Sequence, residues 1–199
     1  TGSTHIGKII AKAAAEHLTP TILELGGKNP CIIDASAPIQ LTAKRIVWGK
    51  YVNCGQTCIA PDYLLVEESV KAPLLKALVE EIKSAYGEDA SAAHSYGRIA
   101  HQKHFDRLVD LIKGSDLVYG GDNDSKTRYL GPTILEVKDT QHPTMVEEIF
   151  GPILPVLTYS NERELEPIID SYERPLGFYI FSKRKKFIKE MFERYSYGG

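Results

Sequence analysis

The chain has 199 residues, of which 43% are hydrophobic and 25% are charged, and it carries a net charge of −2 at pH 7. This composition is typical of a soluble globular protein, and because both charge signs are interspersed it argues against a nucleic acid as the partner. No apolar run reaches the roughly 18 residues that a membrane-spanning helix needs, and no basic segment followed by an apolar core stands at the N-terminus. We therefore expect neither a membrane segment nor a signal peptide in these residues.

The cysteine count indicates the redox compartment. Three cysteines are too few, and odd in number, for the disulfide framework of a secreted domain. We therefore expect reduced thiols and a cytoplasmic protein. Because the chain begins at Thr1 without an initiator methionine and ends in mid-pattern at Gly199, we also expect it to be part of a longer protein.

Taken in chain order, the apolar pattern predicts strands alternating with helices. The first helix is expected to begin after Ser3 or Thr4 and to end before Pro20. Helical periodicity predicts further helices over 38–52, 69–86 with Ser69 as its cap, 101–113, 162–172 with a break at Pro167, and 183–195. Short apolar runs predict strands over 21–25, 31–33, 63–66, 117–119, 129–137, 153–159 and 178–181. Polar segments predict a loop over 87–93 and an exposed hairpin tip or loop over 121–128. The alternation indicates an α/β layered fold with a mostly parallel sheet and flanking helices.

The segment Gly2-Ser-Thr-His-Ile-Gly-Lys8 opens the first predicted helix. It nearly fits the phosphate-loop pattern G-x-x-x-x-G-K-[ST], but Ile9 replaces the hydroxyl residue that would bind Mg²⁺, which argues against a nucleoside triphosphatase. A glycine turn at a helix start still offers free N–H groups and a positive dipole end to an anion. Contact with a pyrophosphate and an ordinary capped helix are the two interpretations of this segment.

Glu24 stands inside the apolar run 21–25, directly before Gly26 and Gly27. Because the alternation in this run is irregular, its side chain is expected either to face solvent or to be partly buried, where desolvation would make the carboxylate a stronger base. A partly buried carboxylate suits general-base work, and the glycine pair allows the backbone to approach a ligand closely.

Cys54 and Cys58 lie four residues apart and could be a metal clip, a disulfide, two inert thiols or a site with one nucleophile. A zinc site usually has C-x₂-C spacing and needs further ligands, so we expect no metal, and a reducing compartment argues against a disulfide. The residues after Cys58 predict a turn into a short helix constrained by Pro61. A helix start would favour the thiolate of Cys58, and its free N–H groups can bind an oxyanion. Cys54 is then expected to be a bystander, buried or lining the site.

Together these segments resemble the aldehyde dehydrogenase superfamily. The segment Leu-Glu-Leu-Gly-Gly-Lys28 is similar to the one that bears the family's general base, and Gly-Gln-Thr-Cys58 to the one that bears its catalytic thiol. Glu24 and Cys58 are 34 residues apart, which is the family's usual separation. The sequence of residues 53–63 resembles the class 3 branch, which includes the fatty aldehyde dehydrogenases, and so do Leu18-Thr-Pro20 and Arg128-Tyr129. The resemblance runs essentially from end to end.

The resemblance implies an aldehyde dehydrogenase-like catalytic domain over 26–199, C-terminally incomplete, preceded by the last helix of a Rossmann-like NAD(P)-binding domain in 1–25. It implies NAD or NADP as the cofactor, and the residues that it implies for binding are Gly2, Ser3, Gly7, Leu25, Gly26, Glu148 and Phe150. Glu148 would hold the nicotinamide-side ribose and Phe150 would lie near the nicotinamide, whereas Glu147 is expected to be a solvated charge.

The implied reaction is the NAD(P)-dependent oxidation of an aldehyde to a carboxylic acid. Cys58 would form a thiohemiacetal and then a thioester, and Glu24 would activate the water that hydrolyses the thioester. Two alternatives stay open: a fragment or relative that is inactive by itself because most of the cofactor domain precedes Thr1, and a CoA-acylating enzyme in which CoA resolves the thioester. The implied partners are a small aldehyde, either medium- or long-chain aliphatic or aromatic, and a second copy of the chain in a homodimer.

Overall fold

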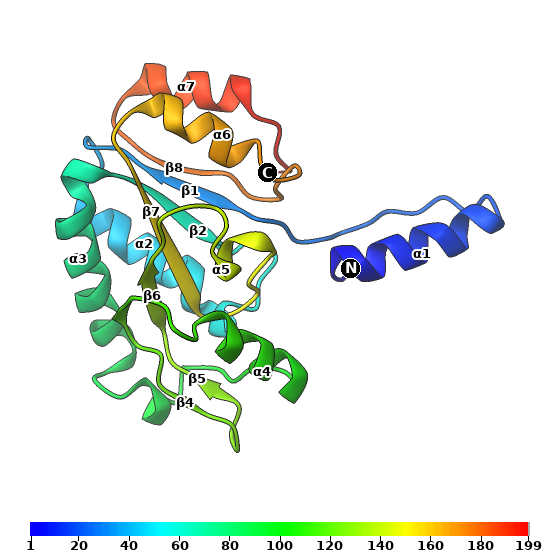
Figure 1. The fold of residues 1–199 in the computed structure, drawn as a ribbon, viewed down its shortest axis with the longest axis horizontal. Helices are drawn as coiled ribbons and strands as arrows, with labels where there is room; N and C mark the ends of the chain where they lie inside the picture. Colours follow the sequence, from blue (N-terminus) through cyan, green and yellow to red (C-terminus); the bar gives the residue numbers. More distant parts are fainter. Residues whose placement is uncertain (199) are drawn as a thin grey trace.

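A computed structural model describes residues 1–198 and shows an α/β body from which one helix extends (Figure 1). The body is built on a six-stranded sheet with the order β3-β6-β7-β2-β1-β8. All neighbouring strands in it run parallel except the antiparallel pair of β3 and β6. The strands of this sheet are β1 (Pro30–Ile33), β2 (Tyr63–Glu67), β3 (Leu117–Tyr119), β6 (Thr133–Glu136), β7 (Ile153–Tyr159) and β8 (Tyr179–Phe181). The predicted mostly parallel α/β sheet is therefore confirmed.

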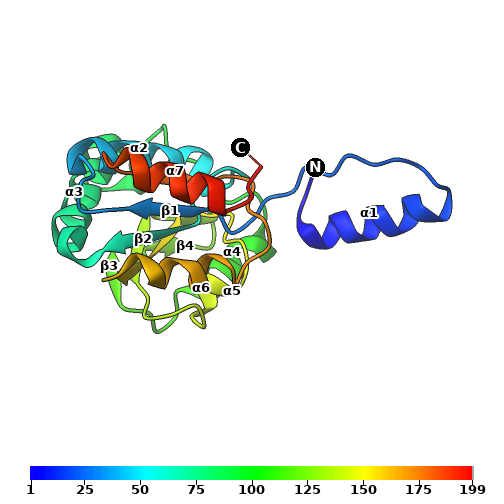
Figure 2. The ribbon, with the colours of Figure 1, turned by 90° about the horizontal axis from the view of Figure 1, so that it is seen from above.

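Helices cover both faces of the sheet, as parallel strands joined by crossovers require. Figure 2 shows α2 above the sheet and α6 below it. The helices are α1 (Thr4–Glu16), α2 (Ile39–Tyr51), α3 (Glu68–Tyr86), α4 (Gln102–Leu111), α5 (Pro143–Val146), α6 (Leu165–Ile169) and α7 (Lys185–Arg194). Single 3-10 turns occupy η1 (Val52–Gly55), η2 (Ala90–Ala92) and η3 (Glu162–Glu164). No helix within the described residues is both long and apolar enough to span a membrane.

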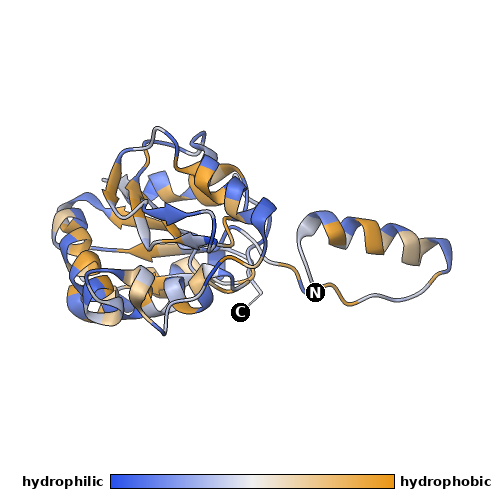
Figure 3. Cartoon of the chain, turned by 90° about the horizontal axis from the view of Figure 1, so that it is seen from below, coloured by the Kyte–Doolittle hydropathy of each residue, from blue (hydrophilic) through white to orange (hydrophobic). Residues whose placement is uncertain are grey.

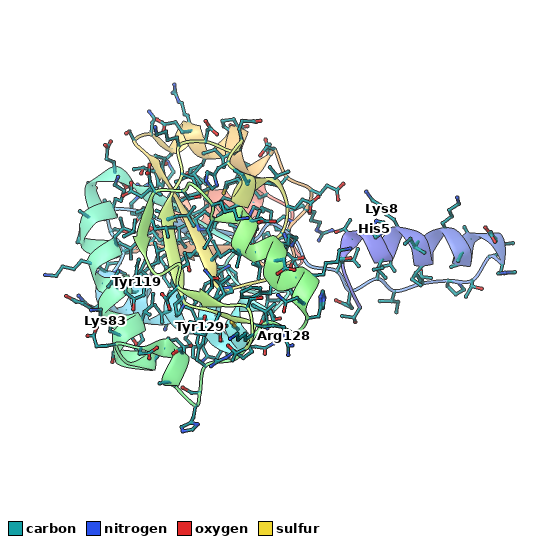
Figure 4. All side chains as sticks on the ribbon, turned by 60° about the horizontal axis from the view of Figure 1, so that its bottom comes forward. His5, Lys8, Lys83, Tyr119, Arg128 and Tyr129 are labelled. Atoms are coloured by element: carbon teal, nitrogen blue, oxygen red, sulfur yellow. The ribbon has the colours of Figure 1, made fainter. Side chains whose placement is uncertain are left out.

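The core lies between these layers. All four residues of β1 and the first four of β2 are buried, which explains why both strands are continuous apolar runs in the sequence. A small hairpin of β4 (Asn123–Asp124) and β5 (Tyr129–Leu130) stands beside the main sheet, and Figure 4 labels Arg128 and Tyr129 on it. Of the two forms expected over 121–128, a hairpin tip or a loop, the structure shows the hairpin.

Helix α1 extends away from the body, and residues 17–27 return from it in an extended path (Figures 1 and 2). Ser3 caps the helix by accepting a hydrogen bond from the N–H of Ile6, as predicted. Figure 3 shows apolar residues along α1, and Ile6, Ile9 and Ile10 are each exposed over about half of their surface. The predicted strand over 21–25 is wrong: within the described residues its backbone makes only one isolated bridge, between Leu25 and Gly2. Without a neighbouring strand this apolar run lies in solvent, and Ile22 is 89% exposed.

Three other predicted elements need correction. The strand expected over 129–137 divides into β5 and β6 because Pro132, which has no N–H, cannot continue a ladder. The helix expected over 162–172 begins as the turn η3, and Pro167 sits in the first turn of α6, where its missing N–H costs nothing. Ser69 does not cap α3: Glu67 occupies the cap position without a side-chain cap bond, and the Ser69 hydroxyl donates to the Glu67 carboxylate instead.

Candidate active site

One large cleft of about 1010 Å³ opens between the start of α1 and the amino edge of the sheet. Segments far apart in the sequence meet there: the residues around Glu24, the loop that ends at Cys58, the start of α4 and the segment 146–150. The sequence-predicted site residues that line it are Cys58, Glu24, Gly2, Ser3, Leu25, Gly26, Glu148 and Phe150. Gly7 alone lies elsewhere, buried in α1 against Leu25, where it lines a separate hollow of about 160 Å³.

Cys58 is half-buried in a tight turn in which the N–H of Ala60 donates to the carbonyl of Thr57 (3.0 Å). The short helix predicted after Cys58 is absent, since Pro61 supplies no N–H and its ring disfavours helical backbone at Ala60. Cys58 therefore does not stand at the start of a helix. Within residues 1–198 the N–H of Cys58 donates to no acceptor, so it is free to meet a bound anion.

The loop before Cys58 has an unusual backbone. Asn53, Cys54 and Gly55 all adopt positive φ angles of 51°, 56° and 72°. A side chain on Gly55 would overlap the carbonyl oxygen of Gly151, so the position needs glycine for space as well as for conformation. Backbone in such sparsely populated regions clusters at functional sites. The amide of Gln56 fixes the loop by donating to Asn53 O (3.1 Å) and Arg98 O (3.0 Å) and accepting from Ala100 N (2.8 Å).

Gly55→Ala in the intact protein is expected to lower the free energy of unfolding, and Gly114→Ala provides the matched control. Both glycines have φ of +72°, but nothing lies within 4 Å of a side chain placed on Gly114. The overlap with Gly151 should therefore cost Gly55→Ala about 1–3 kcal/mol more than the control loses. Denaturant unfolding of the two variants measures the difference, and equal losses would contradict the close contact.

The other two cysteines are buried and all three are free. Burial raises the pKa of the Cys54 thiol to about 11, and its Sγ lies 3.9 Å from the carbonyl oxygen of Leu130. Burial also raises the pKa of Cys31, inside β1. Among the described residues Cys58 is thus the cysteine that a molecule in the cleft can reach. No group of three or more His, Cys, Asp or Glu side chains able to hold a metal gathers in that part of the chain.

Glu24 follows the exposed alternative: its side chain faces solvent at the cleft, and Gly26 and Gly27 come directly after it. Gly26 lies against Glu148, whose carboxylate would overlap any side chain at that position. Glu148 is half-buried, and burial raises the pKa of its carboxyl, an effect that the charge of Asp62 reinforces. The nearby N–H of Gly27 and the positive charges of Lys50 and Arg107 oppose this rise. Glu147 is exposed, as expected.

The segment that carries Glu148 and Phe150 is held by residues that no motif in the sequence marks. From α4, Arg107 donates to the carbonyls of Glu148 and Ile149, and the His104 ring bonds the Phe150 carbonyl (2.7 Å). A buried ion pair between Lys28 and Asp62 adds two further ties, because Lys28 also donates to Thr144 O and Asp62 accepts from Ile149 N (3.1 Å). Phe150 has a positive φ of 53°, so these bonds hold a backbone conformation that is uncommon for its residue type.

The N-terminal motif contributes unequally. His5 lines the cleft beside Gly2 and Ser3, whereas Lys8, which also projects from α1 in Figure 4, is not among the lining residues. The start of α1 lies at this end of the cleft, and the first N–H groups of a helix have no intrahelical partner. Lys8 therefore does not take the place that a phosphate-loop lysine has, whereas the helix start remains a suitable place for an anion.

Lys50, at the end of α2, is fully buried, and its Nζ makes no hydrogen bond within residues 1–198. Burial lowers its pKa to about 8, while Asp62 and Glu148 raise it and Lys28 lowers it further. An unfolded chain restores the ordinary value near 10.4. A folded-state pKa below the unfolded one means that the buried ammonium destabilises the fold fully below pH 8, and that this cost disappears as the pH rises from about 8 to about 10.4.

Lys50→Met is accordingly expected to stabilise the intact protein by about 3 kcal/mol at pH 7, and by progressively less as the pH approaches 10. Lys44→Met is the control, since Lys44 is exposed on the same helix. Denaturant unfolding at pH 7 and pH 9.5 measures both changes. A gain for Lys50→Met that does not shrink with rising pH would contradict the burial of a charged ammonium.

Known proteins resemble this chain in sequence over its whole length. The profile of the "Aldehyde dehydrogenase family" matches residues 1–199. The chain is 48% identical to "Aldehyde dehydrogenase family 3 member A2" of Mus musculus, with 100% of the chain and 41% of that protein covered. It is 46% identical to "Aldehyde dehydrogenase, dimeric NADP-preferring" of Canis lupus familiaris, covering 100% of the chain and 44% of that protein. The chain thus spans about two fifths of the length of these relatives.

Solved structures show the same similarity. The substrate-bound state of Staphylococcus aureus AldH superposes with a TM-score of 0.97 at 42% identity, covering 100% of this chain and 44% of that one. A betaine aldehyde dehydrogenase of Staphylococcus aureus in complex with NAD⁺ superposes with a TM-score of 0.86 at 28% identity, covering 99% and 41%. The α/β fold of this chain is therefore the one found in those proteins.

Proposed function

The chain belongs to the aldehyde dehydrogenase family, and from this premise we propose that it carries the thiol and the base of an NAD(P)-dependent oxidation of an aldehyde to a carboxylic acid. One observation carries the proposal. A half-buried thiol, Cys58, and an exposed carboxylate, Glu24, line the same cleft, and so do Gly2, Ser3, Leu25, Gly26, Gly27, Glu148 and Phe150.

Three features of the cleft fit a dinucleotide cofactor. The start of α1 offers unbonded N–H groups to a pyrophosphate, with Gly2 and Ser3 beside them. The half-buried Glu148 carboxylate can accept hydrogen bonds from ribose hydroxyls, and the contact of Gly26 with that carboxylate leaves no room for a side chain. The Phe150 ring is partly exposed at the cleft, where it can lie against a flat ring. When bound, NAD⁺ or NADP⁺ supplies the acceptor for the hydride.

Cys58 acts as the nucleophile. Its thiolate sulfur bonds to the carbonyl carbon of the aldehyde and gives a thiohemiacetal oxyanion, which the unbonded N–H of Cys58 can stabilise. Loss of the hydride from that carbon re-forms the carbonyl as a thioester on Cys58. Glu24 then takes a proton from water, the resulting hydroxide adds to the thioester carbon, and the C–S bond breaks. Glu24 returns the proton to the departing sulfur, so the products are a carboxylic acid and the free thiol.

Hydrolysis by water is the proposed outcome rather than acyl transfer to CoA. Glu24 lies on the exposed side of the cleft, where water has access, and its carboxylate is available as a base. To test this proposal, the intact protein would be mixed with hexanal or benzaldehyde and either NAD⁺ or NADP⁺. Equal amounts of reduced cofactor and carboxylate are expected, with or without CoA; acyl-CoA as the main product would contradict the proposal.

We further propose that residues 1–25 belong to a cofactor-binding domain and residues 26–199 to the catalytic domain. The separation of α1 from the sheet-bearing body supports this division (Figure 1).

A homodimer is proposed for the intact protein, supported by the relative from dog whose name describes it as dimeric. A cytoplasmic location is proposed from the small, odd number of cysteines. Whether aliphatic or aromatic aldehydes react faster is answered by the same assay with both substrates.

A further inference from the structure

Asn29 stands at the amino edge of the sheet, next to β1, and only 1% of its surface is exposed. Its side-chain nitrogen donates to the carbonyl oxygens of Cys58 (2.8 Å) and Ala60 (3.0 Å). Its side-chain oxygen accepts from the N–H of Gly177 (2.8 Å). Both donor hydrogens of the amide are thus used on the turn that carries Cys58.

The sheet puts Asn29 in a position to make these bonds. Strand β1 pairs in parallel with β2 on one side and with β8 on the other. Asn29 precedes β1, and its carbonyl accepts from the N–H of Asp62 just before β2 (2.9 Å), while Gly177 precedes β8. One side chain therefore joins the entries to three neighbouring strands. It also lies five residues after Glu24, so it connects the segment of the proposed base to that of the proposed nucleophile.

Within the described residues one other side chain ties the Cys58 turn to the sheet. Tyr179 of β8 donates its hydroxyl to the carbonyl of Ile59, between the two carbonyls that Asn29 binds. The carbonyls of three consecutive residues are thereby tied to side chains of the sheet. Because each peptide unit is planar, fixing the Cys58 carbonyl also fixes the direction of the next N–H and the position of the Cys58 Cα.

We propose that Asn29 is a positioning residue that sets the place of the Cys58 thiol relative to a substrate carbonyl in the cleft. The inference rests on the proposed function of Cys58 as the nucleophile. Asn29 itself does not line the cleft, so it acts through Cys58 and touches neither substrate nor cofactor. Displacing a reacting group by about 1 Å can slow a reaction about 100-fold, and a turn released from two of its ties allows such a displacement.

The test uses two variants of the intact protein. Asn29→Asp keeps the size and the acceptor for Gly177 but turns oxygen atoms toward the carbonyls of Cys58 and Ala60. Asn29→Ala removes every side-chain bond. The readout is the rate of the first-turnover burst of reduced cofactor per titrated active site, so that misfolded protein does not count. Both variants are expected to slow the burst about 100-fold at pH 8, while the Kd for NAD⁺ stays within about twofold of the wild type.

A pH profile separates positioning from a general loss of structure. When the new carboxyl of Asn29→Asp is protonated it can again donate one hydrogen bond, so its burst rate relative to wild type should recover as the pH falls. Asn29→Ala should show no recovery. Asn123→Asp is the control, because Asn123 is exposed in the β4–β5 hairpin and its ratio to wild type should stay near one at every pH.

Wild-type burst rates in both Asn29 variants would overturn the inference. A rise in the Kd for NAD⁺ by the same factor as the fall in the burst rate would also overturn it. If Asn29→Asp yields too little folded protein, Asn29→Ser replaces it in the test. Serine keeps one hydrogen-bond donor in a smaller side chain. An unchanged burst rate in that variant also overturns the inference. Cys58→Ser, measured in the same assay, distinguishes a failure of the proposed function from a failure of the proposed role of Asn29. Its retained activity would refute the proposed function, whereas its inactivity combined with normal Asn29 variants would refute only the role of Asn29.

Discussion

Cys58→Ser in the intact protein is expected to reduce aldehyde oxidation by at least about 10⁴-fold, because a serine hydroxyl is not ionised near neutral pH and is a far weaker nucleophile than a thiolate. Within the described residues Cys58 is the one thiol that lies in the cleft; Cys31 and Cys54 are buried. The loss should appear in the first-turnover burst as well as in kcat, since no thioester can form.

The matched control is Cys54→Ala, four residues earlier in the chain. Its sulfur is buried near the Leu130 carbonyl and away from the cleft lining, so turnover per folded molecule should stay within a few-fold of wild type. Stopped-flow absorbance of the reduced cofactor gives both the burst and the steady state. Wild-type turnover in Cys58→Ser, or complete loss of activity in Cys54→Ala, would contradict the assignment of Cys58 as the nucleophile.

Glu24→Gln should separate the two halves of the reaction. The amide has nearly the size of the carboxylate but cannot take a proton from water, so the thioester should form and then persist. We expect a burst of about one reduced cofactor per site at close to the wild-type rate, followed by a steady state about 10²–10⁴-fold slower. An undiminished steady-state rate would exclude Glu24 as the base.

Glu147→Gln is the control for this change, because Glu147 is an exposed carboxylate at the same cleft for which no role is proposed. Both phases should be unchanged in it. If Glu147→Gln reproduced the slow steady state, the effect would come from the charge of the cleft and not from a base at residue 24.

The parts of the fold that follow from the sequence are those whose local pattern and tertiary surroundings agree. Strands β1 and β2 are buried on both faces, and their continuous apolar runs predict them. The run 21–25 is locally just as apolar, but a strand needs a neighbouring strand, and within residues 1–198 this run makes a single bridge, to Gly2. Pro132 divides a predicted strand through a missing N–H that an apolar-run pattern overlooks.

The candidate site shows the same division. Glu24, Cys58 and Glu148 could be selected because each stands in a distinctive glycine-bearing motif, and the structure brings all three to one cleft. Asn29 and Arg107 gave no such signal. They matter through hydrogen bonds to backbone atoms 29 to 148 residues away in the chain. A single polar residue next to a strand or on a helix does not predict which distant backbone atoms it will bind.

In the proposed reaction the acyl group of the substrate becomes bonded to Cys58. Glu24→Gln supplies the means to trap it: the variant would be mixed with NAD⁺ and hexanal, quenched in acid within the burst, digested, and its peptides weighed by mass spectrometry. We expect a hexanoyl group on the sulfur of Cys58, close to one per active site, and none on Cys54 or Cys31. A hexanoyl group on another residue, or a full burst of reduced cofactor with no acylated peptide, would contradict it.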